Sequence, residues 1–174
     1  MTIYDKTFTG RDGRRFRLRP IQAHDDPEIG QLIRGVLKEY QAAEEGTAFA
    51  DDALDQMFDT YARDERSGYW IVRTGDTLAG GAGIAPLKGT VEPTCELQKM
   101  YLRPEFRGSG LGSELLRACE AFARQKGFRY CYLETLPQLQ HAMALYERKG
   151  FVYLDQPLVD TGHFSCTVWM QKQL

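Results

Sequence analysis

Several features that would place this 174-residue chain in a specialised class are scarce or missing. The formal net charge is −2 at pH 7, so there is no basic excess of the kind that binds nucleic acid. No apolar run approaches the length of a membrane span, and residues 1–16 lack the apolar stretch of a secretory signal. We therefore expect a cytoplasmic protein that binds neither nucleic acid nor membrane.

Cysteine motifs are missing as well. The four cysteines are scattered along the chain, and no two of them form a C-x-x-C pair. Zinc and redox motifs of that type are therefore excluded, and we predict no metal. Cys119 and Cys131 lie in apolar stretches, which is typical of small core residues, so we expect reduced thiols.

The overall composition is ordinary for a globular protein. Hydrophobic residues make up 43% of the chain and charged residues 26%, which is enough to build a full core. The length predicts one domain over residues 1–174. Turn composition near residue 10 leaves two options for residues 1–13. Either Ile3 to Phe8 form one arm of a hairpin with the strand predicted at Arg14 to Ile21, or they are a loose terminus.

One stretch, residues 96–120, organises the rest of the chain. An apolar run ends at Leu102, a turn containing proline follows, and Gly108, Gly110 and Gly112 come just before a helix. Glycines have no Cβ, so the backbone can approach a ligand closely. The N–H groups at a helix start are unpaired, and the helix dipole favours negative charge there. The pattern therefore predicts an anion site, with phosphate as the usual ligand.

The neighbouring residues narrow the kind of phosphate ligand. A Walker loop needs Lys-Ser or Lys-Thr after its last glycine, whereas Ser113 and Glu114 follow Gly112. A Walker loop, and with it a kinase or NTPase of that type, is therefore excluded. A Rossmann loop needs Gly-x-Gly-x-x-Gly, and here the third glycine comes one place too early. A nucleotide-binding loop and a glycine-rich turn without any ligand remain alternatives.

Two motifs in the right order resemble one family. Arg107-x-x-Gly110-x-Gly112, after a strand ending in Leu-Arg-Pro, resembles the acetyl-CoA pyrophosphate loop of the GNAT superfamily of N-acetyltransferases. Residues 142–151, AMALYERKGF, resemble the downstream motif of that family, in which a helix carrying Leu-Tyr runs into Gly-Phe and a strand. The resemblance covers residues 70–153 best.

The chain pattern and the resemblance imply a mixed α/β fold with a mostly antiparallel sheet of about six or seven strands, flanked by about four helices. The predicted strands are Arg14 to Ile21, Tyr69 to Arg73, Thr77 to Ile84, Cys95 to Leu102, Tyr130 to Glu134, Phe151 to Leu154 and Ser165 to Met170. The predicted helices carry Ile29 to Leu37, Leu54 to Tyr61, the segment between Gly112 and Gly127, and His141 to Lys149. Glycines at residues 80, 81 and 83 indicate a bulge.

The resemblance also implies how a cofactor would bind. The diphosphate of acetyl-CoA would lie on backbone N–H groups of the loop, and the pantetheine arm would pair with the edge of the central strand. The residues assigned to the cofactor in this way are Met100, Tyr101, Leu102, Arg107, Gly108, Ser109, Gly110, Leu111, Gly112, Ser113 and Tyr146. Many relatives carry a cofactor-binding Asn upstream of this Tyr, where Leu139 stands here. Either Gln138 or Gln140 takes its place, or the contact is absent.

Acetyl transfer to an amine needs a base for the amine proton, and an acid at the leaving thiolate assists it. The resemblance places Glu96 where several relatives carry a general base that acts directly or through water; the alternative is a strand Glu paired with a cation. Glu134 ends the neighbouring strand and is either the base or a ligand for the amine. Tyr146 would donate to the departing sulfur, unless it is simply a packed core aromatic.

Two further features concern the acceptor. His163 and Cys166 form a Cys–His pair that in principle supports a covalent acetyl-enzyme, whereas the family generally transfers directly. His163 is expected to contact the acceptor amine instead. The acidic residues between Glu39 and Asp59 have a single base near them, Lys38, and form either a solvated face or a rim that favours a cationic amine.

These observations predict an acetyl-CoA-dependent N-acetyltransferase that transfers directly to a primary amine of a small molecule or peptide. A non-catalytic acyl-CoA-binding module on the same fold is the main alternative. The resemblance also leaves a homodimer open, with the N-terminal arm or the last strand as the contact.

Overall fold

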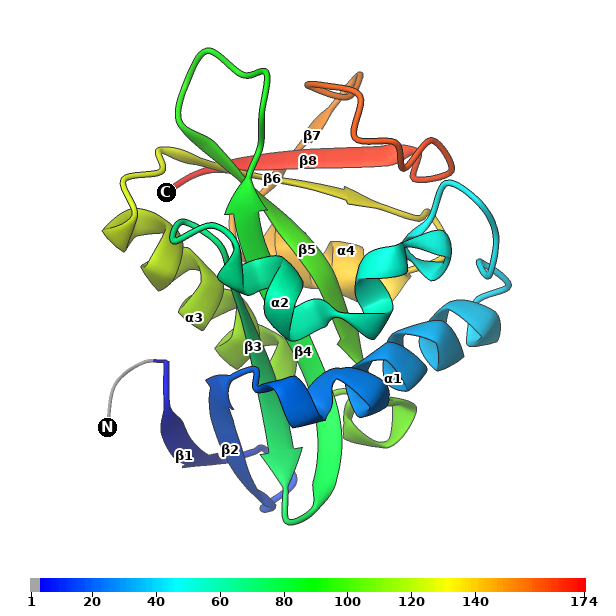
Figure 1. Cartoon of the computed structure of the whole chain (residues 1–174), viewed down its shortest axis with the longest axis vertical. Helices are drawn as coiled ribbons and strands as arrows, with labels where there is room; N and C mark the ends of the chain where they lie inside the picture. The colour runs from blue at the N-terminus through cyan, green and yellow to red at the C-terminus, as the bar shows by residue number, and fades with distance from the viewer. Residues whose placement is uncertain (1–3) are drawn as a thin grey trace.

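The computed structural model describes residues 4–174 (Figure 1). Eight strands form one sheet in the order β1-β2-β3-β4-β5-β6-β8-β7. The strands are β1 (Lys6–Thr9), β2 (Arg15–Pro20), β3 (Gly68–Thr74), β4 (Thr77–Pro86), β5 (Thr94–Leu102), β6 (Tyr130–Thr135), β7 (Val152–Leu154) and β8 (Val168–Gln173). All neighbouring strands are antiparallel except β5 and β6. The mixed, mostly antiparallel sheet is confirmed.

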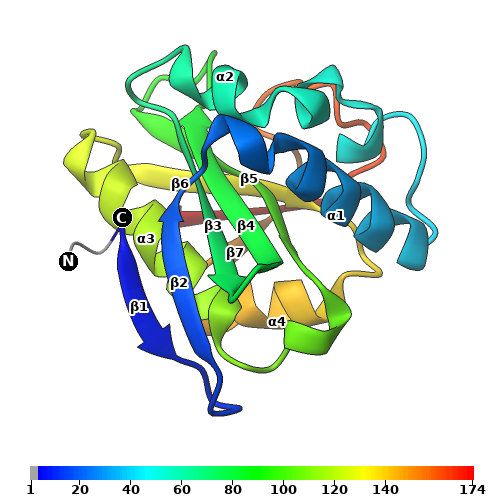
Figure 2. The ribbon, with the colours of Figure 1, turned by 60° about the horizontal axis from the view of Figure 1, so that its bottom comes forward.

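Four α-helices of the described chain cover the two faces of this sheet. They are α1 (Asp26–Glu39), α2 (Met57–Ala62), α3 (Leu111–Gln125) and α4 (Gln140–Arg148). Helices α1 and α2 lie over one face, and α3 and α4 lie over the other (Figures 1 and 2). An apolar core fills each interface. Among residues 4–174, no helix is both long enough and apolar enough to cross a membrane.

The described part of the N-terminal segment forms the hairpin rather than a loose end. Strand β1 pairs with β2, and Phe8 lies opposite Phe16. The hairpin adds an edge strand, so the sheet has eight strands, one more than the largest number expected. Ile3, where the arm was predicted to begin, lies outside the described residues.

The second predicted helix is wrong as a continuous element. A 3-10 turn over Asp52–Asp55 is followed by the short α2, and Gln56 between them has φ −142° and ψ 43°, which is not helical. The Asp26 carboxylate accepts the N–H of Phe58 at 2.8 Å. Because a side-chain oxygen takes this amide, a new helix start is stabilised there.

The predicted bounds of the last strand are also wrong, because β8 begins at Val168 and not at Ser165. The backbone N–H of Ser165 donates to the carbonyl of Gly46 at 3.1 Å, and its Oγ donates to the carbonyl of Glu45 at 2.9 Å. The segment before β8 therefore pairs with the loop after α1, and the sheet register starts only beyond it.

Strands β5 and β6 separate part of the way along, and this separation positions the functional site. Their parallel pairing covers only the first three residues of β5 and ends at Glu96, opposite Tyr132. Beyond that point β5 turns away from β6 (Figure 1). The register of β4 with β5 shifts between Gly81 and Gly83, as the glycines predicted. Lys99 in β5 has a positive φ of 50°.

Candidate functional site

The glycine-rich loop connects the end of β5 to the start of α3. Gly110 caps the helix with φ 93°, and Gly108 has φ 79°, so both use a conformation that favours glycine. Gly112 has a packing reason: a Cβ there would lie 2.9 Å from Leu145 Cδ2 of α4. The Oγ of Ser109 is buried and donates to the Phe106 carbonyl. The loop is thus held open toward solvent at the helix start.

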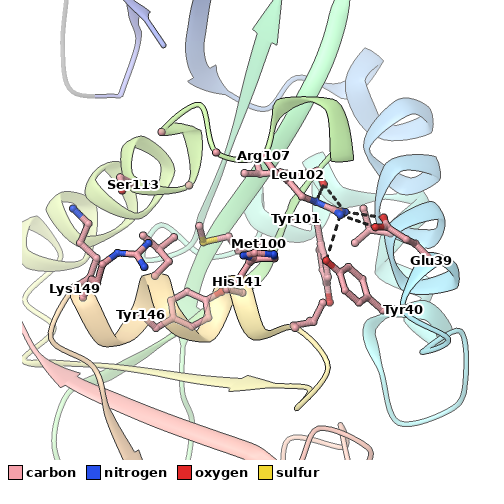
Figure 3. Close-up of a pocket in the computed structure, with 18 of the residues that line it drawn as sticks. Glu39, Tyr40, Met100, Tyr101, Leu102, Arg107, Ser113, His141, Tyr146 and Lys149 are labelled. Atoms are coloured by element: carbon pink, nitrogen blue, oxygen red, sulfur yellow. Dashed lines mark hydrogen bonds and ion pairs between the residues drawn. The ribbon is translucent and has the colours of Figure 1, made fainter. Parts of the chain in front are cut away.

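A cavity of about 900 Å³ lies in front of this loop (Figure 3). It is bounded by the second half of β5, the loop, the C-terminal end of α1, and α4. The predicted cofactor residues that line it are Met100, Tyr101, Leu102, Arg107, Gly108, Gly110, Gly112, Ser113 and Tyr146. Ser109 and Leu111 do not line it, because both are buried behind the loop. Leu139 lines the cavity, whereas Gln138 and Gln140 do not.

Sequence reasoning missed several residues of the cavity wall. They are Arg11, Val36, Glu39, Tyr40, His141, Ala142, Leu145, Arg148 and Lys149. Arg11 sits in the turn of the β1–β2 hairpin, and its backbone N–H donates to the Ser109 carbonyl at 2.9 Å. No local sequence signal brings that turn to the loop, since the contact depends on the tertiary fold. Ala142, Leu145, Arg148 and Lys149 belong to the quoted motif of residues 142–151, in which only Tyr146 was assigned to the site.

The Arg107 side chain is already engaged. Its guanidinium donates to both oxygens of Glu39 at 2.6 and 2.8 Å, and to the carbonyl of Leu102 at 3.2 Å (Figure 3). This ion pair holds the pKa of Glu39 below its usual range. Such a bidentate pair has fixed geometry. The side chain of Arg107 therefore ties α1 to the loop.

Other basic side chains of the cavity are not paired in this way. Arg11, Arg148 and Lys149 have no ion pair with any residue of the described chain. Arg11 lies over the loop, where a Cβ on Gly110 would be 3.8 Å from its side chain. Lys149 lies on the same side of the view as Ser113, away from Glu39 (Figure 3). Positive charge therefore flanks the start of α3, where the helix dipole also favours an anion.

Tyr146 lies on α4 at the deep side of the cavity (Figure 3). It is 5% exposed, and its ring packs on Phe151 with centroids 5.7 Å apart. Burial raises the pKa of its phenol above the usual value, so the hydroxyl stays protonated. That hydroxyl has no hydrogen-bond partner among residues 4–174. Tyr146 therefore combines a packed ring with a free donor.

Glu96 lies where β5 and β6 part. It is 7% exposed, and Gln98 Nε2 donates to its Oε2 at 2.6 Å. The hydroxyl of Tyr61 in turn donates to Gln98 Oε1 at 2.9 Å. Burial, together with the nearby charge of Glu134, raises the pKa of the Glu96 carboxyl above its ordinary value of 4.5. A carboxylate with a raised pKa is better suited to accept a proton near neutral pH.

Glu134 lies beside Glu96 but has different surroundings. Its Oε1 accepts from Tyr132 Oη at 2.7 Å, and its Oε2 accepts from Thr161 Oγ1 at 2.6 Å. Acceptor atoms of Glu96, Glu134 and His163 lie within 4.8 Å of one another. The structure thus brings three predicted site residues together. Their side chains are also of the kinds that bind divalent metals, so the absence of a metal stays a prediction.

His163 belongs to a second set of charged groups at this place. Its Nε2 lies 3.1 Å from Asp51 Oδ1, and Lys99 Nζ lies 2.6 Å from Asp51 Oδ2. The Asp51 carboxylate raises the pKa of His163 above 6.5, because it stabilises the imidazolium. We call Asp51, Glu96, Lys99, Glu134 and His163 the polar cluster. Asp51 and Lys99 were not singled out by sequence, since one comes from the acidic run and the other from the strand bulge.

Cys166 lies at the edge of the polar cluster. Burial and the neighbouring carboxylates raise the pKa of its thiol to about 12. The thiolate is the nucleophilic form of cysteine, and this environment disfavours it. The surroundings therefore do not activate Cys166 as a nucleophile.

The cavity and the polar cluster adjoin along β5. Lys99 of the cluster directly precedes Met100 and Tyr101, which line the cavity, although no residue of the cluster lines the cavity itself. The side chains at this junction offer a base, hydrogen-bond donors and a protonated phenol. Such a set of groups can support proton transfer and acyl transfer to an amine.

Solved structures share this fold. An acetyltransferase of the GNAT family from Staphylococcus aureus Mu50 superposes with a TM-score of 0.78 at 15% identity, over 91% of this chain and 98% of that one. PaiA N-acetyltransferase from Thermoplasma acidophilum, solved in complex with coenzyme A, gives 0.65 at 17% identity, over 91% and 99%. At these identities the likeness concerns the fold.

Similarity in sequence is higher to curated proteins. The chain is 42% identical over 158 residues to the uncharacterized N-acetyltransferase YjgM of Escherichia coli (strain K12), covering 90% of this chain and 94% of that protein. It is 32% identical over 94 residues to N-acetyltransferase 8B of Rattus norvegicus, of which it spans only 42%. Residues 33–151 match the Acetyltransferase (GNAT) family, so the match starts well before residue 70. The chain therefore belongs to the acetyltransferase (GNAT) family of N-acetyltransferases.

Proposed function

We propose that the protein transfers an acetyl group from acetyl-CoA directly to a primary amine of a small molecule or peptide. The observation that carries this proposal is the meeting of two sites at the parting of β5 and β6. Tyr101 and Tyr146 line the glycine-loop cavity, and Lys99 of the polar cluster directly precedes the part of β5 that forms the cavity wall. The relative solved with coenzyme A shares the fold, which supports this choice of cofactor.

Cofactor binding follows from the charges of the cavity. Backbone N–H groups at the start of α3 would take the diphosphate. Arg11, Arg148 and Lys149 would supply further positive charge for the phosphates. The exposed edge of β5 at Met100 to Leu102 would pair with the amide groups of the pantetheine arm, which leads the thioester toward Tyr146.

The chemistry divides between two carboxylates. Glu96 is the base, because its raised pKa lets it take a proton from the ammonium form of the acceptor, directly or through water. Glu134, held by two hydroxyls, binds the amine. The amine nitrogen then attacks the thioester carbon, a C–N bond forms and the C–S bond breaks. Tyr146 donates a hydrogen bond to the departing thiolate, which takes up the proton that the nitrogen loses.

Other properties accompany this proposal. The four cysteines are unpaired, which fits a reducing compartment such as the cytoplasm. A homodimer through β1 or β8 remains a prediction.

The alternative function, a module that binds acyl-CoA without turnover, is disfavoured by the combination of a base of raised pKa and an unpartnered phenol.

The experiment that tests the proposal is release of the CoA thiol from acetyl-CoA in the presence of pooled amines. We expect release with at least one pool and none without amine. Acetyl-CoA should also compete with CoA for binding, whereas ATP and NAD should not. Binding of acetyl-CoA without release in any pool would favour the non-catalytic module.

A further inference from the structure

Two basic side chains of the polar cluster share one carboxylate. Lys99 Nζ lies 2.6 Å from Asp51 Oδ2, and His163 Nε2 lies 3.1 and 3.2 Å from the two oxygens of Asp51. Asp51 carries one negative charge, so it offsets only one of the two cations when His163 is protonated. Asp51 is therefore shared by two basic groups, and the next carboxylates near His163 are those of Glu96 and Glu134, within 4.8 Å.

Lys99 is held in this place by the backbone. Its φ of 50° is unusual for a residue with a side chain, and the hydroxyl of Tyr69 donates to its carbonyl at 2.8 Å. The side chain is only 8% exposed. An ammonium has three N–H donors, and among residues 4–174 the partner of this one is Asp51 alone. Burying an ammonium is costly, so its spare donors point to a further anion as the partner.

The other side of the cluster holds two carboxylates. Glu134 is hydrogen-bonded by two hydroxyls and forms no ion pair with a Lys or Arg of the described chain. Glu96 lies next to it, and His163 is within 4.8 Å of both. An ammonium bound between the two carboxylates would therefore lie close to His163.

The acidic run does not line the site as a wall of free carboxylates. Glu39 pairs with Arg107, and Asp55 pairs with Arg34 at 2.9 Å. Asp51 reaches the cluster, where its charge is already offset by Lys99. Glu44, Glu45, Asp52 and Asp59 form no ion pair in the described chain, but all four are exposed and none lines the cavity, as expected for a solvated face.

We propose that the acceptor is a zwitterionic amine, of which an α-amino acid is the simplest case, with its ammonium between Glu96 and Glu134 and its anionic group on Lys99 and His163. The inference rests on the proposed function for the acetyl transfer itself. It excludes amines without a neighbouring anion, such as a lysine side chain in a protein, as the preferred acceptor. His163 lies within 4.8 Å of both carboxylates, so one small molecule can contact His163 and the two glutamates together.

The test compares matched pairs of acceptors. Amino acids with apolar, polar and charged side chains are assayed against their own decarboxylated amines by release of the CoA thiol. We expect kcat/KM to favour at least one amino acid over its amine by at least about tenfold, because a site built for a polar group rejects an analogue that lacks it. Equal or better use of the decarboxylated amines across the set would overturn the inference.

Substitutions of Lys99 and His163 test which side chains cause the preference for an amino acid over its amine. Lys99→Met keeps the length of the side chain and removes its charge, so the ratio of kcat/KM between amino acid and amine should fall toward one. The ratio is the readout because Lys99 also lowers the pKa of Glu96, which affects both acceptors alike. His163→Gln should lower the ratio as well, and Lys88→Met, at an exposed lysine, should leave it unchanged. An unaltered ratio in both Lys99→Met and His163→Gln contradicts the assignment.

Calorimetry on the CoA-loaded protein separates this inference from the proposed function. Preferential binding of an amino acid that Lys99→Met abolishes, with no thiol release, would retain the ligand class and refute the transfer reaction. Transfer to amines without any preference for the zwitterion would retain the reaction and refute the ligand class.

Discussion

At the scale of single residues, two neighbouring carboxylates differ because their partners differ. Glu96 is nearly buried and takes one hydrogen bond from Gln98, whereas Glu134 takes two from hydroxyls. Burial favours the protonated form of Glu96. Pairs of acidic groups with unlike surroundings commonly divide the roles of base and binder. The same logic separates Tyr146, whose phenol has no partner in the described chain, from the hydrogen-bonded Tyr61 and Tyr69.

Tyr146→Phe should lower kcat by at least about tenfold, because the leaving thiolate loses its hydrogen-bond donor. The ring would still pack on Phe151, so the fold and the Kd for acetyl-CoA should hardly change. Steady-state kinetics together with calorimetry measure both quantities. An unchanged kcat would remove Tyr146 from the mechanism.

Glu96→Gln should lower kcat/KM for the amine by about a hundredfold, since a general base contributes on this order. In the wild type, kcat/KM should fall as the pH drops through the raised pKa of Glu96, because only the carboxylate accepts a proton. That acid limb should be absent in Glu96→Gln and retained in Glu134→Gln, whose main effect should be a higher KM for the amine. A pH profile that is the same in wild type and Glu96→Gln would assign the base elsewhere.

Glu96→Gln should lower activity but increase the stability of the fold. Because the folded-state pKa of Glu96 lies above the unfolded value, its ionisation costs stability as the pH rises through that window. At neutral pH, Glu96→Gln should therefore raise the melting temperature. A lower melting temperature would show that the charged carboxylate is well solvated or paired.

At the scale of elements, local pattern predicted most of the chain. The spacing of Ile29, Ile33 and Leu37 correctly gave α1, and all three are fully buried. The wrong bounds of α2 and β8 have one physical origin, since both depend on hydrogen bonds to distant residues: Asp26 for α2, and the loop at Gly46 for β8. Sequence spacing does not contain such contacts.

The sequence predicted some residues of the candidate site and missed others. Glu96, Glu134 and His163 come together as expected, and most of the loop lines the cavity. Arg11 and Lys99 were missed, because a hairpin turn and a strand bulge bring them in from outside the motifs, and Asp51 was predicted only as one member of the acidic run. Arg107 was expected at the cofactor; it lines the cavity, but its side chain binds Glu39.

The N-terminal hairpin should contribute to cofactor binding through Arg11. Arg11→Ala should raise the KM for acetyl-CoA by roughly tenfold, which corresponds to one charge-assisted contact with a phosphate. Its backbone bond to Ser109 would remain, so the melting temperature should stay unchanged. Arg15→Ala is the matched control, an exposed arginine of the same hairpin that does not line the cavity. Equal effects of the two substitutions would refute a specific role for Arg11.

At the scale of the whole molecule, the sheet places the cavity and the polar cluster next to each other along β5. The cavity is bounded largely by the loop and α4, and the polar cluster lies where β5 leaves β6. Residues far apart in sequence, from Asp51 to His163, are thereby brought together. Such an arrangement favours a ternary complex in which both substrates are bound before the acetyl group moves. The thiol of Cys166, with its pKa raised to about 12, does not offer a covalent route.

The most direct test of this account is mass spectrometry of the intact protein and of the small molecules after mixing with acetyl-CoA. We predict that acetyl-CoA alone leaves the mass of the protein unchanged. With the amine also present, CoA and N-acetylated amine should form in equal amounts. An acetyl group on the protein that then passes to the amine would contradict direct transfer, and bound acetyl-CoA that never yields an N-acetylated product would contradict the enzyme itself.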